Sequence, residues 1–294
     1  MNPGIAYALS AYLIWGLFPL YFRQLADVPA LEVVMHRTVW SLLFVMLVLL
    51  YLKRWAWLGK VVRQPKVLGA FALSALLLSS NWLLYVWAVQ NQHVLDASLG
   101  YFILPLVNVT FAYVFLGERL RRGQWMAVGM AALGVLWLTY QAGHLPWVAI
   151  VLALTFGFYG LLRKVAVLGA LEGLTLETIV LTPIAVAYMA YGVWHGDSVL
   201  LHGPTSTVAW LAFGGPLTAV PLLLFAAGAR RIPMTTLGIL QFVSPSILFV
   251  LSVLVFKEPM ELPRLIGFAL IWSALVVYSL EGLFNSQRMR RLQV

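Results

Sequence analysis

The sequence predicts an all-α membrane protein of ten transmembrane helices, arranged as two inverted five-helix repeats with both termini in the cytoplasm. Three observations predict it. Hydrophobic residues make up 62% of the 294 residues and charged residues only 10%, which in a water-soluble domain would expose a very large apolar surface. The apolar residues form long continuous runs, and one motif recurs in both halves of the chain.

A membrane-spanning helix needs about 20 mostly apolar residues. Ten stretches meet this requirement, at residues 4–22, 33–52, 68–90, 97–116, 123–140, 146–162, 173–194, 207–228, 235–256 and 264–283. Their Leu, Val and Ala runs lack the alternation of an outer-membrane barrel, so we expect helices that satisfy their own backbone groups. The first stretch has no basic residue before it and no small-residue cleavage site, which predicts a retained helix.

The distribution of positive charge predicts the orientation. If the N-terminus is cytoplasmic, the loops that face inward, together with the C-terminal tail, carry most of the 19 lysine and arginine residues. The positive-inside rule then places both termini in the cytoplasm. The net charge of +9 is thus explained by topology, and we expect no nucleic-acid partner.

The recurring motif divides the chain into halves at 1–141 and 142–294, the second ending in a short basic tail. A Leu-Gly pair, a proline and a glutamate occur in the same order twice, as Leu99-Gly100, Pro105 and Glu118 and again as Leu237-Gly238, Pro245 and Glu258. Each half has an odd number of expected helices, so the halves enter the membrane from opposite sides. Many secondary transporters are built from such inverted repeats.

Prolines interrupt several of the expected spans, at positions 19, 105, 183, 216, 221 and 245. Each removes a backbone hydrogen bond and can kink its helix. Such weak points would suit a protein that alternates between two conformations.

Three ionisable residues inside the expected spans are candidates for function, because charge is costly in a membrane. His36 and Arg37 lie about one turn into the second span from the outer side, and Glu177 lies about one turn into the seventh from the inner side. At the rise of an α-helix these depths differ by roughly 15 Å. We therefore expect no direct ion pair between Arg37 and Glu177.

Arg37 is a candidate clamp for a substrate carboxylate, because its guanidinium is a planar fork that stays charged. The alternative is a fixed ion pair with Glu32 or Glu258. His36 could transfer a proton or donate to substrate, or it could hydrogen-bond between helices.

Glu177 is a candidate proton-coupling carboxylate. Alternatively it pairs with Arg163 or Lys164, or stabilises the N-terminal end of its helix through the helix dipole. Glu118 and Glu258 end their helices beside basic residues and are expected to anchor loops.

Uncharged polar and aromatic residues deep in the spans predict a substrate-binding cavity, because facing lipid would waste their hydrogen-bonding groups. With Arg37 and His36, the candidates are Tyr12, Trp15, Asn81, Trp82, Tyr85, Tyr101, Asn108, Tyr159 and Gln241. Aromatic walls with a few polar groups suit a small amphipathic solute. The alternative is hydrogen bonding between helices, with aromatic rings at the membrane interface.

Several classes of chemistry lack their motifs. The chain has no cysteine, which excludes disulfides, thiol catalysis and Cys-ligated metals. It has no Walker loop, no His-Glu-x-x-His, no Gly-x-Ser-x-Gly and no carboxylate and histidine cluster at metal spacing. We expect no cofactor, no metal and no enzymatic activity.

The sequence resembles the RarD branch of the EamA family, in the drug/metabolite transporter superfamily. The likeness covers nearly the whole chain and includes AYLIWGLFPLYF (11–22), EVVMHRTVWS (32–41), ASLGYFILPLVNV (97–109), FLGERL (115–120) and TLGILQFVSP (236–245). It implies a bacterial inner-membrane carrier with a central cavity between its halves. Relatives export amino acids, other metabolites or drugs. The branch usually has Asn before the proline of the fourth helix, whereas this chain has Leu104.

The sequence thus predicts a secondary transporter, working mainly as an exporter, for amino acids or their derivatives. One alternative is an efflux carrier for hydrophobic drugs such as chloramphenicol. A second is a membrane sensor or scaffold without transport, which predicts a closed cavity and full pairing of every buried polar group.

Overall fold

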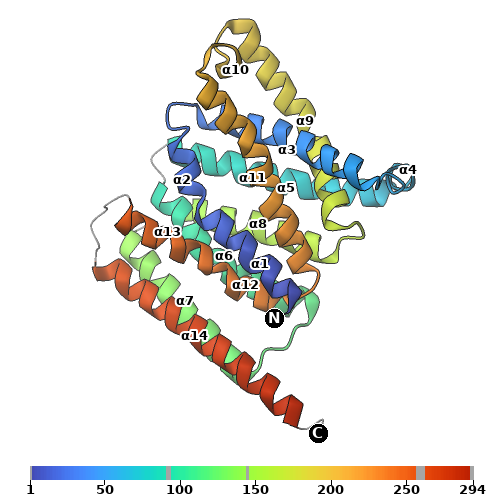
Figure 1. Cartoon of the computed structure of the whole chain (residues 1–294). Coiled ribbons are helices and arrows are strands. Elements are labelled where there is room, and N and C mark those ends of the chain that lie inside the picture. The colour runs from blue at the N-terminus through green and yellow to red at the C-terminus, as the bar shows by residue number, and fades with distance from the viewer. Residues whose placement is uncertain (1, 91–93, 144–145, 256–261, 292–294) are drawn as a thin grey trace.

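The computed structural model describes residues 2–90, 94–143, 146–255 and 262–291, and this part of the chain is helical with no strand (Figure 1). The all-α prediction is confirmed. The helices are α1 (Pro3–Gly16), α2 (Phe18–Arg23), α3 (Ala30–Leu52), α4 (Leu58–Val61), α5 (Pro65–Gln90), α6 (Val94–Leu116), α7 (Arg122–Ala142), α8 (Trp147–Val165), α9 (Ala170–His195), α10 (Val199–His202), α11 (Thr205–Ala229), α12 (Met234–Gln241), α13 (Val243–Leu254) and α14 (Leu262–Arg291).

Nine helical segments of the described chain are long and apolar enough to cross a membrane. They correspond to nine of the ten expected spans, with α1 and α2 together forming the first and α12 and α13 together forming the ninth. The expected span 123–140 is the helix α7, which is not among the nine, so the count of ten stays a prediction. The last helix continues through the basic tail to Arg291.

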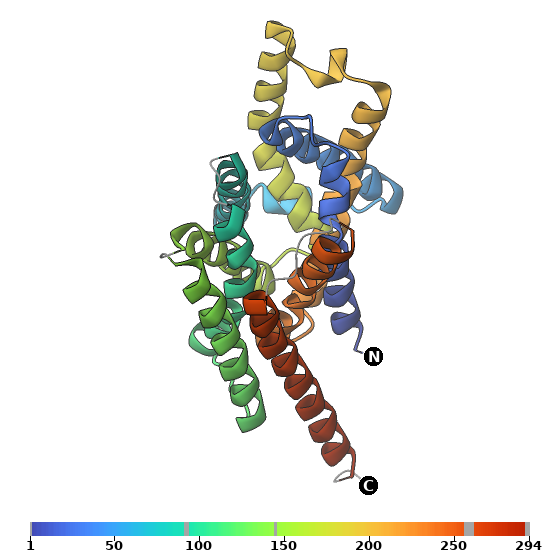
Figure 2. The ribbon, with the colours of Figure 1, turned by 90° about the vertical axis from the view of Figure 1, so that its left-hand side faces the viewer.

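The helices pack in pairs that join the two halves of the chain. α1 packs against α11, α12 and α13, whereas α8 packs against α5 and α6. α3 lies between α9 and α11, and α6 also contacts α12. Figures 1 and 2 show α7 and α14 side by side at the edge of the bundle, where they form the most extensive pair. The core is therefore made by both halves and does not separate into two independent units.

Two membrane segments are broken into two helices each. The first breaks at Leu17, between α1 and α2, and the ninth breaks at Phe242, between α12 and α13. Pro19 and Pro245 lie in the first turns of the second pieces, where a missing N–H costs nothing because that N–H has no intrahelical partner. Pro105 lies inside a continuous helix. At two of the expected weak points the helix is thus interrupted by a single residue, which keeps a right-handed helical conformation.

One end of the bundle is held by ion pairs between loops, and we call it the basic end. Arg54, after α3, pairs with Glu172 at the start of α9, with 2.7 Å between Nη2 and Oε1. Arg121, before α7, pairs with Glu281 within α14, with 2.8 Å between Nε and Oε1. These contacts place the end of α3 beside the start of α9, and the start of α7 beside the C-terminal part of α14.

Glu118 ties two further chain segments to its own loop at the basic end. Its carboxylate accepts hydrogen bonds from the backbone N–H of Met234 at 2.7 Å and of Thr235 at 3.0 Å, at the start of α12. Lys164, at the end of α8, lies 3.9 Å from the same carboxylate. Glu118 therefore anchors a loop, as expected, and Glu258 lies outside the described residues.

Glycines allow close contact between α11 and α3. A Cβ at Gly215 would overlap the backbone carbonyl of Trp40, so α11 and α3 approach within backbone contact. The hydroxyl of Ser41 donates to the carbonyl of Gly215 across this contact at 3.1 Å. Small residues make this approach possible in a bundle whose helices gain little from apolar burial.

We expect Gly215→Ala to lower the melting temperature of the detergent-solubilised protein, because a methyl group would force the two backbones apart. Overpacking of this kind costs about 1–3 kcal/mol. Gly129→Ala is the matched control, because a Cβ there meets no atom within 4 Å and alanine favours a helix more than glycine does. Equal melting temperatures for the two variants would contradict the assigned packing.

Candidate functional site

A cavity of about 410 Å³ lies at the centre of the bundle, between helices of both halves. Most of its wall is apolar. The predicted binding residues that line it are Tyr12, Trp15, Arg37, Asn81, Trp82, Tyr85, Tyr101 and Gln241. Leu104, which departs from the pattern of the resembled family, also lines the cavity and adds apolar surface. Both broken segments contribute, through Tyr12 and Pro19 on one and Gln241 and Pro245 on the other.

Three predicted residues lie outside this lining. Asn108 is buried and donates from Nδ2 to Oε1 of Gln241 at 2.7 Å, which joins α6 to α12. Tyr159 is buried behind the cavity. His36 is fully buried on α3, with Nε2 3.8 Å from Oε1 of Glu32 and no hydrogen-bond partner for either ring nitrogen. The structure therefore does not bring His36 into the cavity beside Arg37.

The charge in the cavity comes from Arg37, which is only 7% exposed. Its Nε donates to Oγ1 of Thr218 on α11 at 2.7 Å. Its Cζ lies 5.4 Å, 5.6 Å and 5.2 Å from the ring centres of Phe18, Phe22 and Trp82, respectively, which is the geometry of cation–π contacts. Aromatic rings thus surround the guanidinium, and toward the part of the chain that the structure describes only Nε donates a hydrogen bond.

No carboxylate of the described residues forms an ion pair with Arg37. Glu32, the first alternative partner, instead accepts a hydrogen bond from the backbone N–H of Val199 at 3.0 Å, so that alternative is wrong. Glu258, the second alternative, lies outside the described residues. Gly214 leaves the room that Arg37 occupies, because a Cβ there would lie 3.0 Å from Cγ of Arg37 and would overlap the hydroxyl of Tyr21.

Aromatic residues form a floor between the cavity and the basic end. The floor consists of Tyr12, Trp15, Phe156, Tyr159 and Phe225, whose neighbouring rings lie 5.4–6.3 Å apart. The hydroxyl of Tyr12 donates to the carbonyl of Leu237 at 3.1 Å, which joins the floor to α12.

The cavity opens away from the basic end. Ala26, in the connection between α2 and α3, lines the cavity and is exposed. Tyr12, on the opposite wall, is fully buried. The α2–α3 connection lies at the end of α3 that is remote from the Arg54 ion pair. A solute could therefore enter at the mouth near Ala26 but not through the floor.

Glu177 belongs to a separate buried cluster below the floor. It is fully buried, accepts a hydrogen bond from Oγ of Ser74 at 2.5 Å and lies 3.6 Å from Nη1 of Arg163. The hydroxyl of Tyr159 lies 3.5 Å from its other oxygen. Arg163 is 1% exposed and donates from Nη2 to the carbonyl of Ala170 at 3.0 Å. Of the alternatives for Glu177, the structure thus shows the pair with Arg163, and no pair with Arg37.

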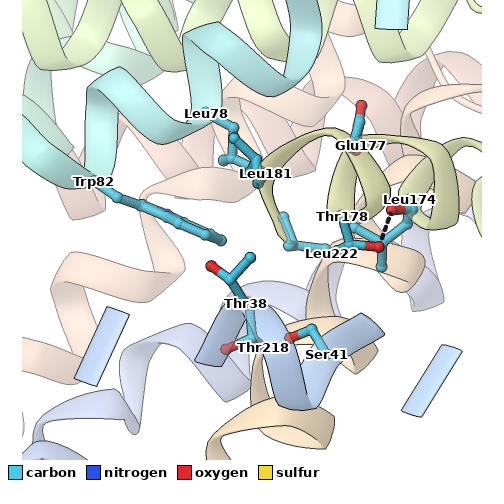
Figure 3. Close-up of a pocket in the computed structure, with 10 residues that line it drawn as sticks. All are labelled: Thr38, Ser41, Leu78, Trp82, Leu174, Glu177, Thr178, Leu181, Thr218 and Leu222. Carbon is cyan, nitrogen blue, oxygen red and sulfur yellow. Dashed lines mark hydrogen bonds between the residues drawn. The ribbon is translucent and has the colours of Figure 1, made fainter. Parts of the chain in front are cut away.

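A second void of about 10 Å³, the size of one water molecule, lies between Glu177 and the central cavity. It shares Trp82, Thr218 and Leu222 with the cavity lining. Figure 3 shows the hydroxyls of Thr38 and Thr218 on one side of this void, and the Glu177 side chain pointing away from them. Both hydroxyls donate to carbonyls of their own helices. In this conformation Glu177 is therefore not connected to the cavity by hydrogen bonds.

Sequence reasoning named Arg163 as a possible partner of Glu177 but did not predict its burial, and it missed Thr218. The Arg163 side chain is among the largest fully buried ones. The signal was Gly173, since a Cβ there would overlap the Arg163 guanidinium, but a glycine alone does not identify its neighbour. Thr218 gave no signal, because its partner Arg37 is 181 residues away.

Comparisons with known proteins agree on one family. The family model of the EamA-like transporter family matches residues 2–140 and 146–280. An uncharacterized transporter of Pseudomonas aeruginosa is 46% identical, over 98% of this chain and 97% of its own length. The RarD protein of Streptomyces exfoliatus is 44% identical, over 98% of this chain and 91% of its own.

The fold has also been seen in a solved structure. A protein crystal structure matches with a TM-score of 0.69 at 18% sequence identity, covering 94% of this chain and 98% of that one. At this identity the likeness concerns the fold alone.

We expect Glu177→Leu to destabilise the protein strongly, because it leaves Arg163 charged, buried and without its carboxylate. Breaking a buried ion pair in this way costs about 3–5 kcal/mol. The double variant Arg163→Met with Glu177→Leu should recover most of the loss, since it removes both charges together. Melting temperatures in detergent measure the cycle, and a double variant no more stable than Glu177→Leu would show that the two side chains are not coupled.

Proposed function

The chain belongs to the RarD branch of the EamA-like transporter family, within the drug/metabolite transporter superfamily, and we propose that it is a secondary transporter of small amphipathic metabolites. The substrates proposed are amino acids or derivatives with an apolar or aromatic side chain. Movement is by alternating access across the bacterial inner membrane, with export as the main direction.

One observation carries this proposal, namely a buried arginine whose free donors face an aromatic cavity. Arg37 lines the cavity, and within the described residues its one hydrogen bond is from Nε to Thr218. A carboxylate can accept two parallel hydrogen bonds from a guanidinium, and it neutralises the charge. The rings of Trp82, Tyr85 and Tyr101 then face the rest of the molecule. Such a site holds a small anion with an apolar tail.

We further propose ten spans in two inverted repeats, and the helix contacts support this. In the proposed repeat, α1 corresponds to α8, α3 to α9 and α5 to α11. The contact of α1 with α11 then corresponds to that of α8 with α5, and the contact of α3 with α11 corresponds to that of α9 with α5. All four contacts are observed. The two matched segments of the family model also fall close to the proposed halves. Placing the basic end in the cytoplasm follows the positive-inside rule, and the cavity then opens outward.

The two other candidate functions are less well supported. A sensor or scaffold would have every buried polar group paired, whereas donors of Arg37 face an open cavity. A carrier for hydrophobic drugs would need the aromatic lining but not the charge. For proton coupling, the pairing of Glu177 with Arg163 supports its structural role. The ring of His36, which is buried, lies 3.8 Å from Glu32 and has no hydrogen-bond partner among the described residues, then makes it the remaining candidate for proton transfer.

Counterflow in proteoliposomes tests the transport proposal. We expect labelled aromatic or branched amino acids or their derivatives to exchange, and Arg37→Ala to reduce exchange of carboxylates about tenfold or more, the loss of a charge-assisted pair. Arg122→Ala is the control, because it removes an exposed cation of the basic end. Full exchange of carboxylates by Arg37→Ala would rule out Arg37 as the group that binds the substrate carboxylate. Exchange of chloramphenicol alone would favour the drug-efflux function.

Sidedness can be tested directly, because the chain has no cysteine and single cysteines need no background changes. We expect Ala26→Cys, at the cavity mouth, to react with a membrane-impermeant maleimide added outside intact cells. Gly59→Cys, at an exposed position of α4, should react only after the cells are permeabilised, so that the maleimide reaches the cytoplasmic side. The reverse pattern would overturn the orientation.

A further inference from the structure

We propose that the central cavity selects organic monoanions over zwitterions, so that its substrates carry a carboxylate and an apolar tail but no free ammonium group. This inference rests on the proposed transport function and names the substrate class of the same site. Amino-acid derivatives such as oxo acids, hydroxy acids and N-acylated amino acids meet the description, whereas free amino acids do not.

The charge of the cavity is the first argument. Among the described lining residues, Arg37 is the one charged group. The other polar groups of the wall, such as Asn81, Ser244 and Gln241, are neutral. A monocarboxylate bound to Arg37 cancels its charge, whereas a zwitterion leaves an ammonium uncompensated beside an arginine that is 7% exposed.

Two buried carboxylates on the helices that pack around the cavity, Glu32 and Glu177, are committed elsewhere, which is the second argument. Glu32 caps the start of α10 through the backbone N–H of Val199 and lies beside His36. Glu177 is held by Ser74 and Arg163 below the aromatic floor. Neither carboxylate lines the central cavity, so neither can meet an ammonium group there.

The aromatic rings beside Arg37 cannot easily replace a carboxylate. A ring face can attract an ammonium group, but the rings of Phe18, Phe22 and Trp82 already face the guanidinium of Arg37. In a free amino acid the ammonium sits on the carbon next to the carboxylate. Binding the carboxylate to Arg37 would therefore place a second cation beside the first, where the low dielectric strengthens repulsion.

A set of ligands with one shared tail tests the inference. Phenylpropionate is the monoanion, phenylalanine the zwitterion and phenylpropionamide the neutral member. Binding to the purified full-length protein is measured by isothermal titration at neutral pH, which avoids passive leakage of acids through vesicles. We expect phenylpropionate to bind about tenfold or more tightly than each of the others, since one uncompensated charge exceeds the free energy of that factor.

Variants assign the preference to Arg37. Arg37→Gln should bind the three ligands alike, Arg37→Lys should keep the order with weaker binding of the anion, and Arg122→Gln should match the wild type. If Arg37→Gln does not fold, the wild-type series and Arg37→Lys still decide.

The inference is overturned if phenylalanine or the amide binds the wild type as tightly as phenylpropionate, or if none of the three binds. Counterflow then separates the two proposals. Exchange of free amino acids with no preference for monoanions would leave the transport function standing without this selectivity. Absence of exchange for every carboxylate would remove the transport proposal itself.

Discussion

The cost of holding charge inside an apolar bundle governs this structure, and the protein meets that cost in two ways. Arg163 is compensated within the protein, by Glu177 and by the carbonyl of Ala170. Arg37 has a hydroxyl and three ring faces but no carboxylate among the described residues. An arginine that is paired permanently stabilises a fold. One that is left incompletely paired in a cavity is available to a ligand.

The compensated pair and the aromatic floor form one unit, because Tyr159 belongs to both. Its hydroxyl lies 3.5 Å from Glu177, and its ring stacks on Phe225 with 6.1 Å between centroids and 14° between planes. Phe225 in turn contacts Tyr12, which bonds to Leu237 on α12. The aromatic floor at the closed side of the cavity is thus held by two contacts, one to the Arg163–Glu177 ion pair and one to α12.

Sequence alone predicted what depends on local composition, and it failed where distant contacts decide. Hydropathy located the spans, and the rarity of a charge in an apolar run identified Arg37. The role of Arg163 depended on where α8 ends and on the room left by Gly173, neither of which is a local property. His36 adjoins Arg37 in sequence, yet successive residues of a helix point about 100° apart, and only Arg37 lines the cavity.

The helix breaks separate the closed side of the cavity from the open side. Tyr12 and Trp15 of the floor precede the break at Leu17, and the mouth residue Ala26 follows it. In the other half, Leu237 precedes the break at Phe242 and Pro245 follows it. The hydrogen bond from Tyr12 to Leu237 joins the two pieces on the closed side. Each break therefore lies between residues of the floor and residues of the open side, and α1 packs against both pieces of the ninth segment, α12 and α13, so that the first segment contacts both sides of the second break.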